Sequence, residues 1–127
     1  MRTFINGENS LTVIQDWQPH CWINIECPTL EELNYLTDEL QIPQSFLNDI
    51  EDPDERPRIE HEDDWKIIIM RIPVRDTAHH GLPFSTVPLG IILRGDIIVT
   101  LCYHQNDMIA DFISYNQIGR ASCRERV

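Results

Sequence analysis

The chain has 127 residues, with 21 acidic against 10 basic side chains and a formal net charge of −11. This length predicts one domain, and the acidic excess argues against a nucleic-acid partner, because DNA and RNA binders need a basic surface. No stretch reaches the roughly 18 apolar residues of a membrane-spanning helix, and the first residues lack the apolar core of a signal peptide. The four cysteines form no C-x-x-C pair, so reduced thiols in a cytosol are expected.

The N-terminal quarter predicts three strands. Arg2–Ile5 and Leu11–Gln15 are expected to form a β-hairpin, because the dipeptide Asn6-Gly7 between them favours a tight turn. Trp22–Glu26 predicts a third strand, in which alternate side chains face opposite sides of the sheet.

Two helices are expected next. Thr29 and Glu32 stand at the spacing of a capping box and predict the start of the first helix. Its expected apolar stripe is Leu30, Leu33, Leu36 and Leu40.

The second helix is expected to begin near Pro43, where a missing N–H costs nothing. Phe46, Leu47 and Ile50 define its predicted buried face. At about 100° per residue, Asn48 points away from that face and Asp49 falls at its border.

The rest of the chain predicts mostly strands. Arg56–His61 is expected to be extended, and Trp65–Val74 is apolar on both faces, which is typical of a central strand covered on both sides. Thr86–Arg94 and Ile97–Tyr103 predict a hairpin with a type II′ turn at Gly95-Asp96.

A polar loop is expected over Asp76–Phe84, and Asp107–Asn116 predicts a third helix. Its expected buried residues are Met108, Ile109, Phe112 and Ile113. About six strands and three helices predict an α/β domain of layered type, with a mixed, largely antiparallel sheet and helices packed on it.

An acidic cluster follows the second helix. Glu51, Asp52, Asp54 and Glu55 lie close to Asp49 in the sequence, and carboxylate oxygens suit hard cations such as Mg²⁺. The spacing matches no calcium-binding loop, so a solvated acidic turn is the simpler interpretation.

Other metal and catalytic patterns are weaker. His61–Asp64 lacks the second histidine of H-E-x-x-H and reads as a turn. His20, Cys21 and Cys27 do not have four ligands at zinc spacing, and the two cysteines are expected to be small buried residues. His79-His80 reads as an exposed pair. No nucleophile motif or phosphate-binding loop is present, so enzyme activity is not expected, and a metal-dependent enzyme is the least favoured reading.

Six segments, taken in order, resemble the N-terminal cytoplasmic domain of the CorA-type magnesium transporter family over roughly Trp22 to Tyr103. They read W-I-N-I-E, T-L-E-E-L-N-Y-L, Q-I-P-Q-S-F-L-N-D-I, E-R-P-R-I-E followed by W-K-I-I-I-M-R, and V-P-L-G-I-I-L-R-G-D-I-I-V-T. The order and spacing of the segments, rather than any single one, carry the resemblance.

The resemblance implies an αβα sandwich on the cytosolic side of a homopentameric channel in the inner membrane. A stalk helix and two membrane helices with a Gly-Met-Asn motif would follow and are absent here, so this fragment could not itself transport. The domain would act as a metal sensor, with low-affinity regulatory Mg²⁺ between neighbouring subunits. Asp49 matches the family's carboxylate ligand for that Mg²⁺, its partner would lie on the stalk helix, and Asn48 stands at a position that is often acidic.

Two alternatives stay open: a stand-alone soluble acidic binding module of the same fold, and a zinc-exporting relative. The transported ion (Mg²⁺, Co²⁺, Ni²⁺ or Zn²⁺) and the direction of transport are not readable from these residues. Ile118–Val127 resembles the translation of sequencing-adapter DNA, although a genuine basic tail is the other reading. The expected division is therefore residues 1–117 as the CorA-like domain and residues 118–127 as a non-native tail.

Overall fold

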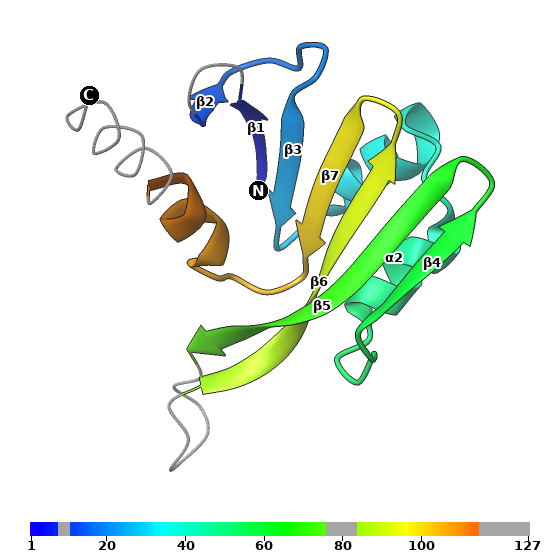
Figure 1. Ribbon diagram of the computed structural model, residues 1–127, viewed down its shortest axis with the longest axis vertical. Coiled ribbons are helices and arrows are strands. Elements are labelled where there is room, and N and C mark those ends of the chain that lie inside the picture. The colour runs from blue at the N-terminus through cyan, green and yellow to red at the C-terminus, as the bar shows by residue number, and fades with distance from the viewer. Residues whose placement is uncertain (8–10, 76–83, 115–127) are drawn as a thin grey trace, which may run out of the picture.

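The computed structural model describes residues 1–7, 11–75 and 84–114, and within them the chain builds one twisted sheet of seven strands (Figure 1). The strands are β1 (Arg2–Asn6), β2 (Thr12–Ile14), β3 (Trp22–Glu26), β4 (Arg58–Glu62), β5 (Trp65–Arg75), β6 (Phe84–Arg94) and β7 (Ile97–Cys102). Their order across the sheet is β2-β1-β3-β7-β6-β5-β4. The pairing of β3 with β7 is parallel and the other pairings are antiparallel, which confirms the predicted mixed, largely antiparallel sheet.

The seventh strand is β4, which the sequence predicted only as an extended segment. It pairs along its whole length with β5, with Ile59 opposite Ile68. The predicted hairpins also form. Gly95 takes a φ of +53° between β6 and β7, the positive value that a type II′ turn requires at its first central position.

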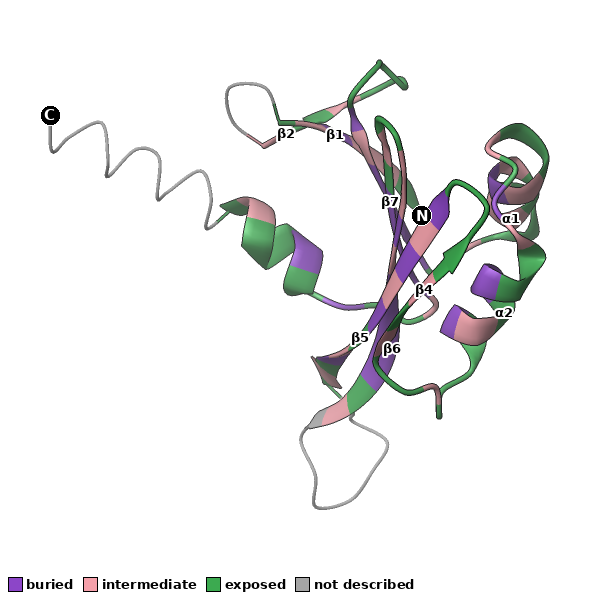
Figure 2. Cartoon of the chain, turned by 45° about the vertical axis from the view of Figure 1, so that its right-hand side comes forward, coloured by how far each residue is buried: buried purple, intermediate pink, exposed green. Residues whose placement is uncertain are grey.

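Helices cover one face of the sheet more fully than the other (Figure 2). On the first face lie α1 (Leu30–Asn34), the π-helical segment η1 (Tyr35–Glu39) and α2 (Gln44–Glu51). Residues 108–114 form a helical segment on the opposite side of the sheet (Figures 1 and 2). In the part of the chain that the structure describes, no helix combines the length and apolar character needed to span a bilayer.

The main core fills the space between the first face and its helices. Buried side chains from four strands (β3, β5, β6 and β7), from α2 and η1, and from two positions outside these elements form it: Cys21, Ile23, Ile25, Leu36, Ile42, Phe46, Leu47, Ile50, Trp65, Ile67, Ile69, Ile92, Val99 and Leu101. Removing this apolar surface from water is the dominant stabilising term of the fold.

The first helix confirms its predicted cap but not its whole predicted stripe. Thr29 Oγ1 accepts from the Glu32 amide at 3.2 Å, and the Glu32 carboxylate accepts from the Thr29 amide at 3.0 Å. Leu36 is fully buried, whereas Leu30 is 74% exposed. The prediction for Leu30 was wrong because the first turn projects beyond the packed face, and the helix continues as a π-helix, which changes the angle between successive residues.

The predicted burial of β5 on both sides is only partly correct. Trp65, Ile67 and Ile69 are buried against the helices, but Met70 on the other face is 40% exposed. Ile98 of β7 is 41% exposed on that same face. Of the helical segments in the described residues, the 108–114 segment stands over this side (Figure 2). Its Met108 and Asp111 line a pocket with Val74 and Arg75 at the end of β5, and it leaves Met70 and Ile98 partly exposed.

The 108–114 segment buries less of itself than predicted. Ile109 is buried, but Met108 is 37% and Phe112 53% exposed. Phe112 meets the edge of Trp22 with ring centroids 6.2 Å apart. Those two predictions were wrong because the segment touches the sheet near β3 and otherwise faces solvent.

A chain of hydrogen bonds joins β3 to β7 across their parallel pairing. Trp22 Nε1 donates to Thr100 Oγ1 at 2.7 Å, and that hydroxyl donates to Asn24 Oδ1 at 2.7 Å. Asn24 and Thr100 are buried, so the bonds offset the cost of taking polar groups out of water.

Helix α2 approaches β6 at a glycine. A Cβ built on Gly90 would lie 2.2 Å from Ile50 Cδ1 and 2.5 Å from Ile50 Cγ1. The absence of a side chain at Gly90 therefore sets how closely α2 can lie against the sheet.

We expect Gly90→Ala to lower the free energy of unfolding by about 1–3 kcal/mol, because overpacking forces α2 away from β6. Urea denaturation measures the change. The double variant Gly90→Ala/Ile50→Ala is the control: it removes the atoms that clash, so its loss should be smaller than the sum of the two single losses. Additive losses would contradict the close approach.

Candidate metal centre

Asp49 lies on the last turn of α2, at the margin of the buried face. Pro43 caps the start of the helix, and Phe46, Leu47 and Ile50 are buried. Asn48 is exposed and the Asp49 side chain is 31% exposed. The helical-wheel prediction of their orientation is therefore confirmed, and it leaves the Asp49 carboxylate within reach of solvent.

Arg58 gathers three carboxylates around one guanidinium group. Its Nη2 donates to Asp49 Oδ2 at 2.9 Å, and its Nε donates to Glu60 Oε1 at 2.6 Å. Its Nη1 donates to Glu55 Oε1. We call these four residues the Arg58 cluster. Three carboxylates against one cation leave two negative charges uncompensated within it.

The Arg58 cluster joins parts of the chain that the sheet brings together. Asp49 comes from α2, Glu55 from the acidic turn after it, and Arg58 and Glu60 from the start of β4. The Arg58 side chain is 26% exposed, so the ion pairs are partly desolvated and stronger than pairs in open water.

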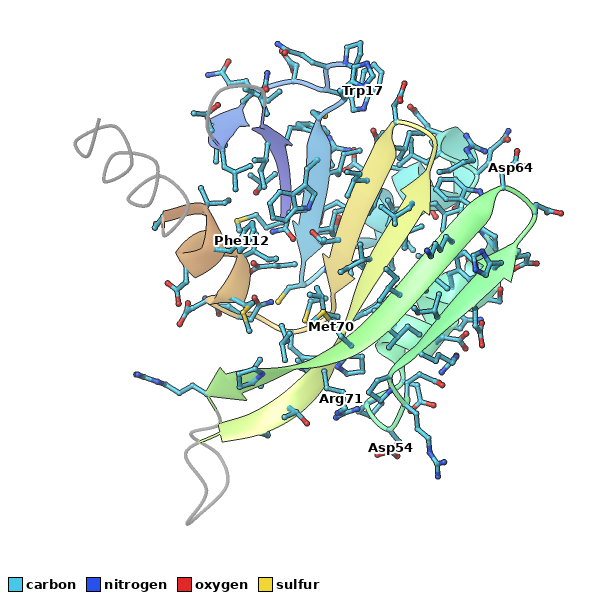
Figure 3. The ribbon with its side chains drawn as sticks, viewed as in Figure 1. Trp17, Asp54, Asp64, Met70, Arg71 and Phe112 are labelled. Atoms are coloured by element: carbon cyan, nitrogen blue, oxygen red, sulfur yellow. The ribbon has the colours of Figure 1, made fainter. Side chains whose placement is uncertain are left out.

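Arg71 of β5 lies beside the acidic turn and holds it in place (Figure 3). Its Nη1 donates to the carbonyl oxygens of Pro53 at 2.9 Å and Glu55 at 3.0 Å. Its other donors are anchored on β6, where Nε meets Thr86 Oγ1 at 3.0 Å and Nη2 meets the Thr86 carbonyl at 2.8 Å. The turn that carries Glu55 is thereby tied to the sheet.

We expect Arg71→Met to accelerate amide hydrogen exchange at Glu55 by about tenfold, which corresponds to about 1.4 kcal/mol of lost local stability. The Glu55 amide donates to the Asp52 carbonyl within the turn, so its exchange reports the opening of the turn. Arg75→Met, at an exposed position of the same strand, is the matched control. Equal exchange in the two variants would contradict the anchoring role.

Tyr103 supports α2 from the end of β7. Its hydroxyl donates to the Leu47 carbonyl at 3.3 Å. Burial, and secondarily the Glu51 carboxylate, raise the pKa of Tyr103 to about 12. The phenol therefore stays neutral and keeps its hydrogen bond at physiological pH.

We expect the fold to lose stability between about pH 10 and pH 12, because Tyr103 ionises near pH 10 in the unfolded chain but near pH 12 in the native one. Below pH 10 both states are protonated, so the stability is fully present there. Urea unfolding at about pH 9 and about pH 11 measures the loss. Tyr103→Phe should lose less stability between these two pH values. Part of the loss should persist in the variant, because burial also raises the pKa of Tyr35. An unchanged loss in the variant would contradict the prediction.

The ligand set at Asp49 is incomplete within one chain. No three histidine, cysteine, aspartate or glutamate side chains among the described residues are grouped so that they could hold a metal ion. Mg²⁺ requires oxygen ligands in octahedral geometry and usually keeps several waters. Asp49 fits such an ion as one carboxylate ligand, with water or a second molecule supplying the others.

The remaining candidate groups are placed as follows. His61, Glu62, Asp63 and Asp64 are all exposed, but only Asp63 and Asp64 form the expected turn. His61 and Glu62 belong to β4 and pair with Lys66 and Trp65 of β5. Cys21 is buried, but Cys27 is exposed at a φ of +46°, so the prediction that it is buried was wrong. His79-His80 and Cys123 lie outside the described residues.

Glu51, Asp52 and Asp54 are exposed and agree with a solvated acidic turn, whereas Glu55 is half buried and paired with Arg58. Burial raises the pKa of the Cys102 thiol, so that thiol is not an activated nucleophile.

The sequence prediction missed Arg58 as the centre of the site. R-P-R was noted as part of a motif, but its charges were not matched to the acidic residues on either side. The available signal was the position of Arg58 between Glu55 and Glu60, a stretch in which Arg56 also lies.

Comparison with known proteins identifies the class of protein that this domain represents. A layered α/β domain with an acidic turn after a short helix matches the model of the CorA-like Mg2+ transporter protein family over residues 17–126. The chain belongs to this family, which confirms the resemblance seen in the sequence. No curated protein matches the chain.

Solved structures show the same fold. The complete CorA magnesium transporter from Methanocaldococcus jannaschii has a TM-score of 0.74 at 21% identity, covering 95% of this chain and 38% of that one. The soluble domain of CorA from the same organism has a TM-score of 0.70 at 23% identity over 87% of this chain and 44% of that one. The ZntB cytoplasmic domain from Vibrio parahaemolyticus has a TM-score of 0.64 at 15% identity, covering 86% and 46%. This chain therefore spans less than half the length of the structures it matches.

Proposed function

We propose that this chain is the cytoplasmic, metal-sensing domain of a CorA-like divalent-cation transporter in the inner membrane. The observation that carries the proposal is the family match over residues 17–126, which includes a half-exposed carboxylate, Asp49, at the end of α2. Transport itself would belong to membrane helices elsewhere in the protein. This chain covers only 38% of the complete CorA transporter, which supports such a division.

Magnesium is the proposed ion. The two structures whose names specify the CorA transporter have TM-scores of 0.74 and 0.70, against 0.64 for the ZntB domain. The candidate ligand is a carboxylate on an acidic surface, and hard oxygen donors suit Mg²⁺ better than they suit zinc, which favours nitrogen and sulfur. A zinc-exporting relative is the competing assignment.

The proposed mechanism is a population shift in a homopentamer. Each chain carries a net charge of −11, so neighbouring subunits repel one another. A low-affinity Mg²⁺ ion bound at Asp49, between this domain and its neighbour, offsets that repulsion and favours the closed packing. When cytosolic Mg²⁺ falls, the ion leaves and the open state gains population.

We expect Asp49→Asn to remove most of the protection from proteolysis that Mg²⁺ confers on the assembled full-length protein. Asparagine keeps the size of the side chain but removes the charge that holds the cation. Limited proteolysis over a Mg²⁺ titration measures the protection. Asn48→Ala, at the exposed neighbouring position, is the control and should behave like the parent. Equal Mg²⁺ midpoints for Asp49→Asn and the parent would overturn the role of Asp49.

The reading frame beyond Gln117 tests the transporter assignment separately. A long amphipathic helix followed by two apolar segments of about 20 residues each would support it. A stop codon at that point would favour the stand-alone acidic binding module instead.

A further inference from the structure

The Asp49 carboxylate already has a cationic partner. Its Oδ2 accepts from Arg58 Nη2 at 2.9 Å. A Mg²⁺ ion bound to the same oxygen would have to approach to about 2.0–2.1 Å. The carboxylate has further lone pairs that Mg²⁺ could use, but the guanidinium and the metal ion would then lie within a few ångströms of each other and repel each other as like charges.

Arg58 does not depend on Asp49 alone. Its Nε is bound to Glu60 Oε1 at 2.6 Å, and its Nη1 is bound to Glu55. If Asp49 turned toward a cation, the guanidinium would keep two carboxylate partners, so no buried charge would be left unpaired. The exchange of Arg58 for a metal ion at Asp49 therefore has a low structural cost.

We propose that Arg58 is an internal competitor of the cation and raises the Mg²⁺ concentration at which Asp49 responds. This inference rests on the proposed function, because it assumes that Asp49 is a Mg²⁺ ligand. The guanidinium occupies the carboxylate when Mg²⁺ is scarce and shifts onto Glu55 and Glu60 when Mg²⁺ is abundant. Arg58 thereby weakens the response of the sensor without removing it, because Glu55 and Glu60 can accept the guanidinium when it leaves Asp49.

The test is the Mg²⁺ midpoint of protease protection in the full-length protein. Arg58→Gln should lower the midpoint about five- to tenfold, because it removes a positive charge in contact with the ligand. Arg58→Lys should lower it by a smaller factor, since one ammonium group cannot hold three separate carboxylates as a planar guanidinium does. The lysine variant keeps the charge and serves as the readout if the glutamine variant does not fold.

Arg56→Gln is the matched control. Arg56 is exposed two residues away, and the substitution makes the same change in net charge without touching the side chains of the Arg58 cluster. A lower midpoint for Arg58→Gln than for Arg56→Gln supports competition at Asp49. Equal midpoints for the two variants would show only a general charge effect and overturn the inference.

Whether the Mg²⁺ midpoint of the Arg58 variants falls or rises distinguishes two roles of Arg58. A higher midpoint in both Arg58 variants would mean that the guanidinium positions Asp49 for the cation, which also overturns the competition. Asp49→Asn distinguishes this failure from that of the proposed function. If Asp49→Asn raises the midpoint while Arg58→Gln leaves it unchanged, the sensor role of Asp49 stands and only the competitor role of Arg58 falls.

Discussion

The parallel pairing of β3 with β7 is the constraint on which the rest of the structure depends. After β3 the chain crosses the sheet through α1, η1 and α2, enters at the far edge as β4, and returns strand by strand until β7 meets β3. The helices must therefore span the sheet between its middle and its edge. This route ends α2 beside the first residues of β4, and so it brings Asp49 to Arg58.

Charge organises the surface where that crossing ends. Two arginines do different work there: Arg71 binds backbone carbonyls of the acidic turn, whereas Arg58 binds carboxylates. Arg71 fixes the position of the turn, and Arg58 reduces the repulsion among Asp49 of α2, Glu55 of the turn and Glu60 of β4. The two arginines hold the acidic segment against the sheet, so its carboxylates keep a fixed orientation.

Features that depend on neighbours in the sequence could be predicted. The Thr29–Glu32 cap, the buried face of α2 and the orientation of Asp49 all follow from spacing within one helix, and the strands follow from alternation and turn residues. The fold family followed from the order of these local elements. The role of Asp49 as a metal ligand came from the resemblance and remains a proposal.

The features that the sequence did not predict correctly share a different cause. Leu30, Met70 and Phe112 are apolar residues whose burial depends on which elements stand opposite them, and no periodicity in the sequence contains that information. The π-helical turn of η1 has no composition signal of its own. Arg58 pairs with Asp49 nine positions earlier, across a turn, so the partnership became visible only with the path of the chain.

The contact between Gly90 and Ile50 has a mechanical consequence. Because the Ile50 side chain of α2 rests directly on the backbone of β6 at Gly90, there is little compressible space to absorb a displacement. The residue that transmits a push from the sheet, Ile50, is the immediate neighbour of Asp49 in the chain. A displacement of α2 at Asp49 would therefore press Ile50 against the backbone of β6 at Gly90.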